Sequence, residues 1–420
     1  MPVVYIVLVL AVFVIIGAPL FTIIGTISLL GFSSQGIDTG AIVVEMYRLA
    51  SQPVLLAIPL FTVAGYFLAE SKAPQRIVAF AQALIGWMPG GLAVVVLASC
   101  AIFTAFTGGS GITIVALGGL VFPILIAEKY DEKFVLGLVT TSGSLGLLFP
   151  PSLPIILYGT VAEVSIDQLF RAGIVPGILL VAVLAIYSIR QGYASKIERH
   201  PFDAKRLWTA FRSVVWEIPL PFFIIGGIYG GYFTATEAAA VTAFYVFIVE
   251  VFIYKDLKLT TDVPRVMKES MVLVGAILMI LATAMGLTSY LIDQQIPQQL
   301  FELIRQLVQS KTLFLVILNF FLLIIGMMME IFSAIVVVPL IVPIAKQYGV
   351  DPIHLGIIFL ANLEIAFLMP PVGMNLFMSS FRFRKSIGQV TVATLPFILV
   401  LLIGLLIITY VPQLSLWLVK

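Results

Sequence analysis

Two stretches of the sequence, TSGSLGLLFPPS at residues 141–152 and ANLEIAFLMPPV at residues 361–372, carry a Pro-Pro pair at the same position. The two pairs lie 220 residues apart, and Pro123 and Pro343 keep the same offset. In each case the prolines follow an apolar run that also contains small residues. Three prolines in one register indicate an internal repeat, and Pro inside an apolar helix indicates that the helix is interrupted.

The composition is that of a membrane protein. The 420 residues are 61% hydrophobic and only 10% charged, with a mean hydropathy of +1.15, whereas soluble domains average about 25% charged residues. Apolar stretches recur along the whole chain, and a membrane span needs about 20 such residues. We therefore expect an all-α polytopic membrane protein with roughly a dozen membrane segments, the first of which, at residues 3–30, is retained rather than cleaved.

Other classes of protein are disfavoured by residue counts. One Cys and two His make a transition-metal centre or a disulfide framework improbable, and a net charge of +2 gives no reason to expect nucleic acid as a partner. There is no HExxH, no GxSxG and no Cys/His constellation, so the sequence does not predict an enzyme or a cofactor. Glu237 and Thr234 have the spacing of a capping box, which predicts a helix start there.

Each repeat has the pattern of a two-armed apolar segment, interpreted as a re-entrant helical hairpin, followed by a broken helix. From these patterns we divide the chain into N-terminal scaffold helices (1–88), a first repeat core (89–190, with hairpin 89–128 and broken helix 131–162), a cytoplasmic loop (191–213), second scaffold helices with an amphipathic helix (214–311), a second repeat core (312–384, with hairpin 312–346 and broken helix 351–384), and a C-terminal helix (385–420).

The distribution of charge predicts an orientation. If the N-terminus is cytoplasmic and both hairpins are re-entrant, 17 of the 23 Lys and Arg residues face the cytoplasm, in agreement with the positive-inside rule. The two repeats then have opposite orientations in the membrane. Inverted repeats with discontinuous helices are typical of secondary transporters, whose binding site lies near the middle of the bilayer.

The breaks suggest a site for a cation. The first Pro-Pro pair removes two backbone donors, so we expect carbonyl groups between Gly146 and Phe149 to be released, and the second pair does the same between Ala366 and Met369. Carbonyl groups at the C-terminal end of a half-helix carry partial negative charge, which suits a dehydrated Na⁺. The alternative is that each proline only kinks its helix.

The sequence resembles the large membrane subunit of tripartite ATP-independent periplasmic (TRAP) transporters, the DctM-like family. The matching stretches are FTGGSGITIVALGGLVFPILI (106–126), GSLGLLFPPSLPIILYG (143–159), DQLFRAGIVPGILL (167–180), GGYFTATEAAAV (230–241) and VDPIHLGIIFLANLEIAFLMPPVGMNLF (350–377). The resemblance implies an elevator-type protein of the bacterial inner membrane, in which a mobile domain with both hairpins slides against a scaffold. It implies Na⁺-driven import of small organic acids, such as C4-dicarboxylates or sialic acid.

The resemblance also implies partners and site residues. The partners are a small four-span membrane subunit (DctQ-like) and a periplasmic substrate-binding protein (DctP-like). The first tip has Thr107-Gly108-Gly109 where a Ser-rich tip is commoner in the family. The implied residues are Thr107, Gly108, Ser110, Gly146, Phe149 and Pro150 for a first sodium site; Gly326, Glu330, Ser333, Ala366, Met369 and Pro370 for a second sodium site; and Ser152, Asn362 and Asn375 for substrate.

Several alternatives stay open at this stage. Glu330 and Glu364 are acids in the second repeat, and each is either a proton-coupling group or, for Glu364 in particular, a hydrogen-bonded tether inside the mobile domain. A channel would share re-entrant segments, and a Na⁺- or H⁺-coupled anion transporter that needs no binding protein would share the repeats.

Overall fold

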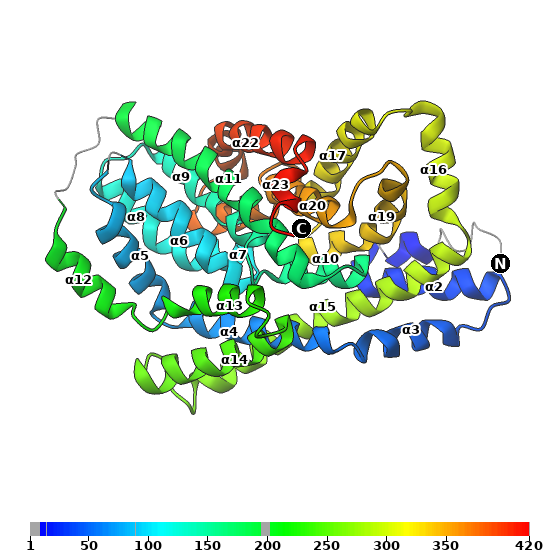
Figure 1. The fold of residues 1–420 in the computed structure, drawn as a ribbon, viewed down its shortest axis with the longest axis horizontal. Helices are drawn as coiled ribbons and strands as arrows, with labels where there is room; N and C mark the ends of the chain where they lie inside the picture. The colour runs from blue at the N-terminus through cyan, green and yellow to red at the C-terminus, as the bar shows by residue number, and fades with distance from the viewer. Residues whose placement is uncertain (1–8, 14, 89, 195–201, 420) are drawn as a thin grey trace.

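A computed structural model describes residues 9–13, 15–88, 90–194 and 202–419, and helices are the only regular secondary structure among them (Figure 1). The predicted N-terminal orientation and part of the predicted cytoplasmic loop concern residues 1–8 and 195–201, which lie outside the described residues. The capping box is confirmed, because the Thr234 side chain accepts from Glu237 N and the Glu237 carboxylate accepts from Thr234 N at 2.8 Å.

The first half of the chain contains two groups of helices. The N-terminal group comprises α2 (Leu20–Ser34), α3 (Gly40–Ala50), the 3₁₀ turn η1 (Pro53–Leu56), α4 (Ala57–Glu70) and α5 (Ala73–Ile85). The next group comprises α6 (Gly91–Thr107), α7 (Ser110–Thr113), the π-helical η2 (Ile114–Gly118), α8 (Gly119–Ala127), α9 (Glu132–Ser142), the 3₁₀ turn η3 (Leu145–Leu148) and α10 (Leu153–Ala162).

The long helix α11 (Ile166–Ala194) follows the first broken helix. The second half has a similar plan and begins with α12 (Ala204–Ser213), α13 (Pro219–Tyr229), α14 (Ala235–Ile248), the π-helical η4 (Val249–Ile253), α15 (Asp262–Asp293) and α16 (Ile296–Leu307). The last group is α17 (Lys311–Met328), α18 (Ile331–Ala334), the 3₁₀ turn η5 (Ile335–Val337), α19 (Val338–Gln347), α20 (Pro352–Ala366), α21 (Met374–Phe383), α22 (Ile387–Tyr410) and α23 (Gln413–Leu416).

The helices have the length and composition of membrane spans. Among the described residues, seven helices are long and apolar enough to cross a bilayer, or up to eight if the pair Glu132–Leu148 and Leu153–Ala162, bent by 45°, is one span. Five further apolar helices are shorter. The chain is therefore an all-helical, multi-span membrane protein. Whether the two-armed segments re-enter the membrane stays a prediction.

Both repeats are interrupted where the sequence places the Pro-Pro pairs. In the first, η3 ends at Leu148 and α10 begins at Leu153; in the second, α20 ends at Ala366 and α21 begins at Met374. Both Pro-Pro peptide bonds are cis.

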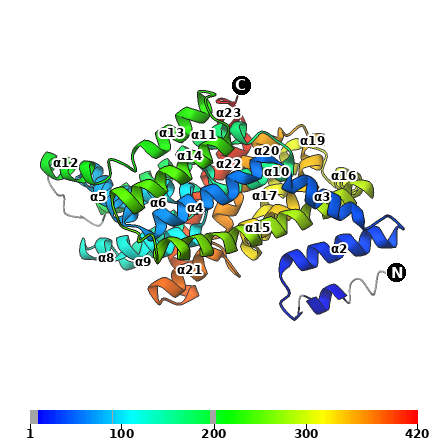
Figure 2. The same cartoon turned by 90° about the horizontal axis from the view of Figure 1, so that it is seen from below.

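The long helix α15 runs beside the N-terminal helices and packs against α2, α3 and α4, while α14 packs against α4 (Figure 1). The segments α5 and α12 lie together at the opposite end of the molecule from α2 and α3 (Figure 2). Of these helices, α4 packs against α6 and α10, and α15 packs against α18 and α19.

The two broken helices pack on each other reciprocally. Helix α10 packs against α20 and α19, and α21 packs against α9 and η2. At the centre, Ser144 Oγ donates to the Glu364 carbonyl oxygen at 3.3 Å, and these two residues are themselves 220 positions apart. Corresponding residues of the two repeats therefore meet at the contact between the halves.

Candidate functional site

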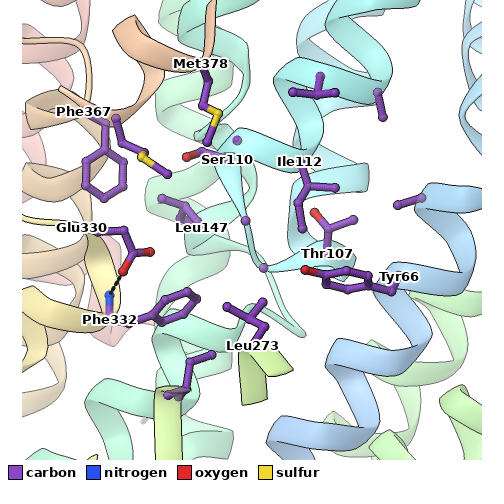
Figure 3. Close-up of a pocket in the computed structure, with 18 of the residues that line it drawn as sticks. Tyr66, Thr107, Ser110, Ile112, Leu147, Leu273, Glu330, Phe332, Phe367 and Met378 are labelled. Atoms are coloured by element: carbon purple, nitrogen blue, oxygen red, sulfur yellow. Dashed lines mark hydrogen bonds between the residues drawn. The ribbon is translucent and has the colours of Figure 1, made fainter. Parts of the chain in front are cut away.

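A cavity of about 630 Å³ collects the interrupted segments of both halves. The first tip (residues 107–111) and the second tip (Glu330 and Phe332) both line it, and so do Leu147 and Phe367 beside the two breaks. The remaining walls come from α4, α7, η2, α15 and α21. Figure 3 shows Glu330 and Phe332 entering from one side and Thr107 and Tyr66 from the other.

Glycine gives the first tip its shape. Helix α6 ends because Gly108 adopts a left-handed conformation with φ of +66°, and its N–H donates to Thr104 O at 2.8 Å. A Cβ at Gly108 would lie 2.6 Å from Leu153 Cδ1, at the start of the helix that follows the first break. The tip and the first break are therefore in direct contact, which only a glycine at this position allows.

Two hydroxyl groups of the first tip are buried beside the cavity. Thr107 is 1% exposed and Ser110 is 6% exposed, and both line the cavity wall. Within the described part of the chain, Thr107 Oγ1 has no hydrogen-bond partner. A buried hydroxyl group without a partner costs about 1–3 kcal/mol, so this atom is suited to a ligand that supplies the missing interaction.

The first break is closed and tightly packed. A Cβ at Gly146 would lie 2.4 Å from both Ala101 O and Ala105 N, so the break rests directly on the backbone of α6. The expected release of its carbonyl groups is partial. Gly146 O accepts from Phe149 N at 3.1 Å, and Phe149 O accepts from Ser152 N at 3.0 Å. Each carbonyl oxygen has a second lone pair. Pro150 is buried.

The second tip is built around a carboxylate. Glu330 is the N-cap of α18, and its Oε2 accepts from Phe332 N at 2.9 Å. Ser333 N donates to the Glu330 carbonyl oxygen at 3.0 Å. A Cβ at Gly326 would lie 2.6 Å from Ala366 Cβ, so α17 rests on α20 as closely as α6 rests on the first break.

The second break is more open than the first. Pro370, Pro371 and Val372 are exposed, whereas the corresponding prolines of the first break are buried. The break is tied to the second tip because Val372 N and Gly373 N both donate to Met327 O, at 3.2 and 3.1 Å. The Ala366 carbonyl oxygen accepts from Met369 N at 3.0 Å.

The three residues predicted to bind substrate do not line this cavity. Ser152, Asn362 and Asn375 are each 0% exposed. Asn362 Nδ2 donates to Asn319 Oδ1 at 2.7 Å, and Asn375 Nδ2 donates to Thr140 O at 3.2 Å. Ser152 Oγ and the Oδ1 atoms of both asparagines are without a partner among the described residues. Their role in substrate binding stays a prediction.

Of the predicted sodium-site residues, the cavity brings together Thr107, Gly108, Ser110 and Glu330. The other predicted residues do not line the cavity: Gly146, Phe149 and Pro150 in the first repeat, and Gly326, Ser333, Ala366, Met369 and Pro370 in the second.

Sequence reasoning missed the walls that α4 and α15 contribute. Tyr66 and Glu70 come from α4, and Leu273, Ile277 and Ile280 come from α15. In an apolar span these aliphatic residues carry no signal, and only Glu70, a charge at the end of a span, could have drawn attention.

Sequence reasoning also missed a buried ionic cluster outside the cavity, which we call the Arg76 cluster: Arg76, Glu217, Glu250, Asp256 and Tyr254. The Arg76 guanidinium bonds Glu217, contacts Glu250 Oε2 at 2.9 Å and Asp256 Oδ2 at 2.5 Å, and lies 3.8 Å from the Tyr254 ring. Its side chain is only 11% exposed. The cluster joins α5 to η4, to the residues after η4 and to Glu217 before α13. The acid within an apolar span, Glu250, was the available signal.

The fold defines a class of protein, the polytopic helical membrane proteins. The chain superposes on the YdaH transporter of Alcanivorax borkumensis with a TM-score of 0.64 at 13% identity, covering 90% of this chain and 87% of that one. The family follows from sequence. Residues 6–414 match the family described as "Tripartite ATP-independent periplasmic transporter, DctM component", and the chain belongs to this family of large permeases.

Relatives of the chain agree on the family and differ in substrate. It is 37% identical to the C4-dicarboxylate TRAP transporter large permease protein DctM of Pseudomonas aeruginosa, over 93% of this chain and 92% of the relative. It is 34% identical to the isethionate TRAP transporter permease protein DctMQ of Oleidesulfovibrio alaskensis (97% and 65%). It is 29% identical to the ectoine permease TeaC of Halomonas elongata (96% and 95%). The chain is a transport permease and not an enzyme.

Proposed function

We propose that the chain is the membrane permease of a Na⁺-coupled importer that takes small organic acids from a periplasmic binding protein and moves them by an elevator mechanism across the bacterial inner membrane. The observation that carries the proposal is the cavity itself. It brings together two tips and two breaks that are about half a chain apart in sequence. A transporter with inverted repeats needs such a convergence at its binding site.

One Na⁺ would bind at each tip. At the first, Thr107 Oγ1 offers an unpartnered oxygen, and the carbonyl oxygens of Gly146 and Phe149 each keep a lone pair. Ser110, Gly108 and Pro150 complete the proposed set. Binding of the ion would replace interactions that Thr107 lacks in the structure, which would order the tip against the break.

The second ion would bind between Glu330 and the second break. Gly326 brings α17 close to Ala366, and the Glu330 carboxylate already caps α18 at the tip. Ser333, Met369 and Pro370 are the other proposed members. Because the Pro370 side of this break is exposed, we expect ion binding there to depend on how the tip closes.

The elevator movement is supported by the division of the cavity wall. One side belongs to α4 and α15, which pack against each other while α15 also packs against α2 and α3, and the other side belongs to the tips and breaks. A cavity between two such groups is where solute would bind if one group slides past the other. The inward movement would be driven by the Na⁺ gradient and by the membrane potential, worth about 2.3 kcal/mol per charge per 100 mV.

The partners proposed are a four-span DctQ-like subunit and a DctP-like binding protein. The family is tripartite by name, and the isethionate relative carries both M and Q in the name of one protein, of which this chain spans 65%. We also propose that the N-terminus faces the cytoplasm, on the charge distribution given above.

The proposal is tested by uptake into liposomes that contain this chain and the small subunit. Uptake should require an inward Na⁺ gradient and the binding protein. It should stop when either the Na⁺ gradient or the binding protein is left out. Uptake that persists when choline replaces Na⁺ would contradict the coupling. Uptake of free solute without the binding protein would instead support a binding-protein-independent transporter.

A further inference from the structure

We propose that the outward face of helix α12 binds the head groups of anionic phospholipids. We call this face the α12 surface, and it comprises Lys205, Trp208, Thr209 and Arg212. None of these residues lines the cavity. The proposal therefore concerns a different part of the molecule and does not depend on how solute or ions bind.

The four residues of the α12 surface share one face because of their spacing. They occupy positions i, i+3, i+4 and i+7, which lie on one side of a helix. All four are exposed, and the large side chain of Trp208 is 58% exposed. The other side of the helix carries the buried Ala210 and the half-buried Leu207 and Phe211. Helix α12 therefore has an inner face that packs on the protein and an outer face that meets the surroundings.

Contacts along the helix fix the direction of the α12 surface. Phe211 packs on Phe80 of α5, with 6.1 Å between the ring centroids. At the C-terminal end, the Tyr254 hydroxyl group of the Arg76 cluster donates to the Ser213 carbonyl oxygen at 2.7 Å. Helix α12 lies beside α5 at one end of the molecule (Figure 1). The surface is thus presented by a helix that is attached to its neighbours, and not by a free loop.

The basic side chains of α12 have no acidic partners. Lys205 and Arg212 are exposed, and Arg206 on the flank donates to the uncharged Gln82 at 3.1 Å. None of these three basic residues forms an ion pair with any residue that the structure describes. The acid at the N-cap, Asp203, accepts from the Lys205 and Arg206 backbone N–H groups. Positive charge therefore exceeds negative charge on this helix, which favours anionic partners.

Aromatic side chains indicate that the partner belongs to a bilayer. Trp87, Phe202 and Trp216 lie next to α12 and are exposed, as Trp208 is. The rings of Trp87 and Phe202 are in edge contact, with 6.4 Å between their centroids. Exposed tryptophans together with Lys and Arg are typical of helices that lie at the membrane–water interface. Lipid head groups are the anionic groups present at that level of a multi-span protein.

A second amphipathic helix, α16, lacks these features. Figure 1 shows α12 and α16 at opposite ends of the molecule. The charged residues of α16 are Glu302 and Arg305, which have opposite signs, and the Arg305 guanidinium lies over the Phe301 ring at 5.9 Å. The helix contains no tryptophan. An anionic head group is therefore complementary in charge to α12 and not to α16, which makes α16 a control within the same chain.

The test measures quenching of tryptophan fluorescence by brominated lipids in phosphatidylcholine vesicles that contain the full chain. Three of the four tryptophans, Trp87, Trp208 and Trp216, lie on or next to α12 and report on lipids bound there. Brominated phosphatidylglycerol is compared with brominated phosphatidylcholine at the same mole fraction. A basic residue near an anionic head group strengthens binding about fivefold. We therefore expect the affinity at α12 to be at least about fivefold higher for phosphatidylglycerol.

Two variants test whether the α12 surface causes this preference. The double variant Lys205→Gln/Arg212→Gln removes two charges from the surface, so its affinities for the two lipids should become nearly equal. The control Arg305→Gln removes one exposed charge from α16 and should keep the native preference. Equal quenching by the two lipids in the native chain would overturn the proposal. An undiminished preference in the double variant would overturn it as well.

A final measurement distinguishes lipid from a protein partner on the same surface. The variant Thr209→Cys, made in a Cys100→Ala background, places a reactive thiol on the α12 surface. In detergent without added lipid, it should react with a maleimide at the same rate in the isolated chain and in the complex with the small subunit. A clear loss of labelling in the complex would overturn the proposal, because the small subunit would then cover the surface.

Discussion

At the scale of single residues, hydrogen bonding distinguishes a threonine that is available to a ligand from one that only packs. Thr107 Oγ1 lies beside the cavity and lacks a partner among the described residues, whereas Thr104, one turn earlier in the same helix, has Oγ1 bonded to Gly143 O at 2.9 Å. The two threonines have the same chemistry, and only the one at the tip is left for a ligand. Sequence alone placed Thr107 at a tip, but its unsatisfied hydroxyl group depends on the packing around it.

Thr107 gives the first prediction. Thr107→Ala removes one oxygen of the proposed first ion site, so we expect the Na⁺ concentration for half-maximal uptake to rise about tenfold, equivalent to about 1.4 kcal/mol. Thr107→Ser keeps the hydroxyl group and should stay close to the native value. The measurement is the Na⁺ dependence of uptake in liposomes. Equal Na⁺ dependence of Thr107→Ala and the native protein would argue against this ligand.

Two buried acids give a second prediction. Glu250 and Glu364 are both 0% exposed, but Glu250 is paired with Arg76 at 2.9 Å, while neither carboxylate oxygen of Glu364 has a partner within the described residues. The structure thus gives no support to Glu364 as a hydrogen-bonded tether through its side chain. Breaking a buried pair costs about 3–5 kcal/mol, so Glu250→Gln should lower the unfolding temperature clearly.

Glu364→Gln, in contrast, should leave the unfolding temperature unchanged or raise it, because the amide is uncharged and costs less to bury. Both variants would be measured in the same detergent and at the same Na⁺ concentration. A loss of stability in Glu364→Gln as large as in Glu250→Gln would show that an unseen partner holds the Glu364 charge.

At the scale of helices, the sequence predicted where helices are interrupted, but it did not predict which helices form the wall of the cavity. The Pro-Pro pairs and the glycines of the first tip carry a strong local signal, because Pro cannot donate and Gly adopts positive φ. Helix α15 carries no such signal. Its residues Leu273, Ile277 and Ile280 are ordinary for a span, and their place in the cavity wall follows only from how α15 packs on α4.

The same limit applies to the expected substrate residues. Asn362 and Asn375 are polar residues in the second broken helix, but the register of α20 and α21 turns their amide nitrogens towards Asn319 and Thr140. Helical register relative to a neighbouring segment is a property of tertiary packing, so no spacing in the sequence could have shown it.

Close packing of the first break gives a third prediction. Gly146→Ala places a methyl group 2.4 Å from two backbone atoms of α6, and overpacking of this kind costs about 1–3 kcal/mol. The control is Gly275→Ala in α15, where no atom lies within 4 Å of the new Cβ. We expect a lower unfolding temperature for Gly146→Ala and no loss for Gly275→Ala. Equal effects would mean that the break is looser than the structure shows.

At the scale of the whole molecule, cysteine labelling tests the orientation that the charge distribution predicts for the chain. The only cysteine of the sequence, Cys100, is buried. The variant Cys100→Ala therefore provides a cysteine-free background for labelling. Lys205 on α12 and Arg305 on α16 are both exposed, and the charge distribution predicts that they face opposite sides of the bilayer. In intact cells, an impermeant maleimide should label Arg305→Cys and spare Lys205→Cys. Labelling of both, or of Lys205→Cys alone, would contradict the predicted orientation.

Reciprocal packing of the two halves supports a common role for them. The hydrogen bond between Ser144 and the Glu364 backbone places corresponding residues at the centre, and the tips of both halves end in one cavity. A repeat that served only folding would not need to bring its two interrupted ends to the same wall.

The most direct test is a high-resolution structure of the complete complex, determined once in NaCl and once in choline chloride. In NaCl we expect density for a cation bounded by Thr107 Oγ1 and the Gly146–Phe149 carbonyl groups, and a second beside Glu330 and Ala366. Both should be absent in choline chloride, with the tips less ordered. Identical maps in the two salts, without density at either position, would contradict the proposal that paired helix breaks bind the coupling ions.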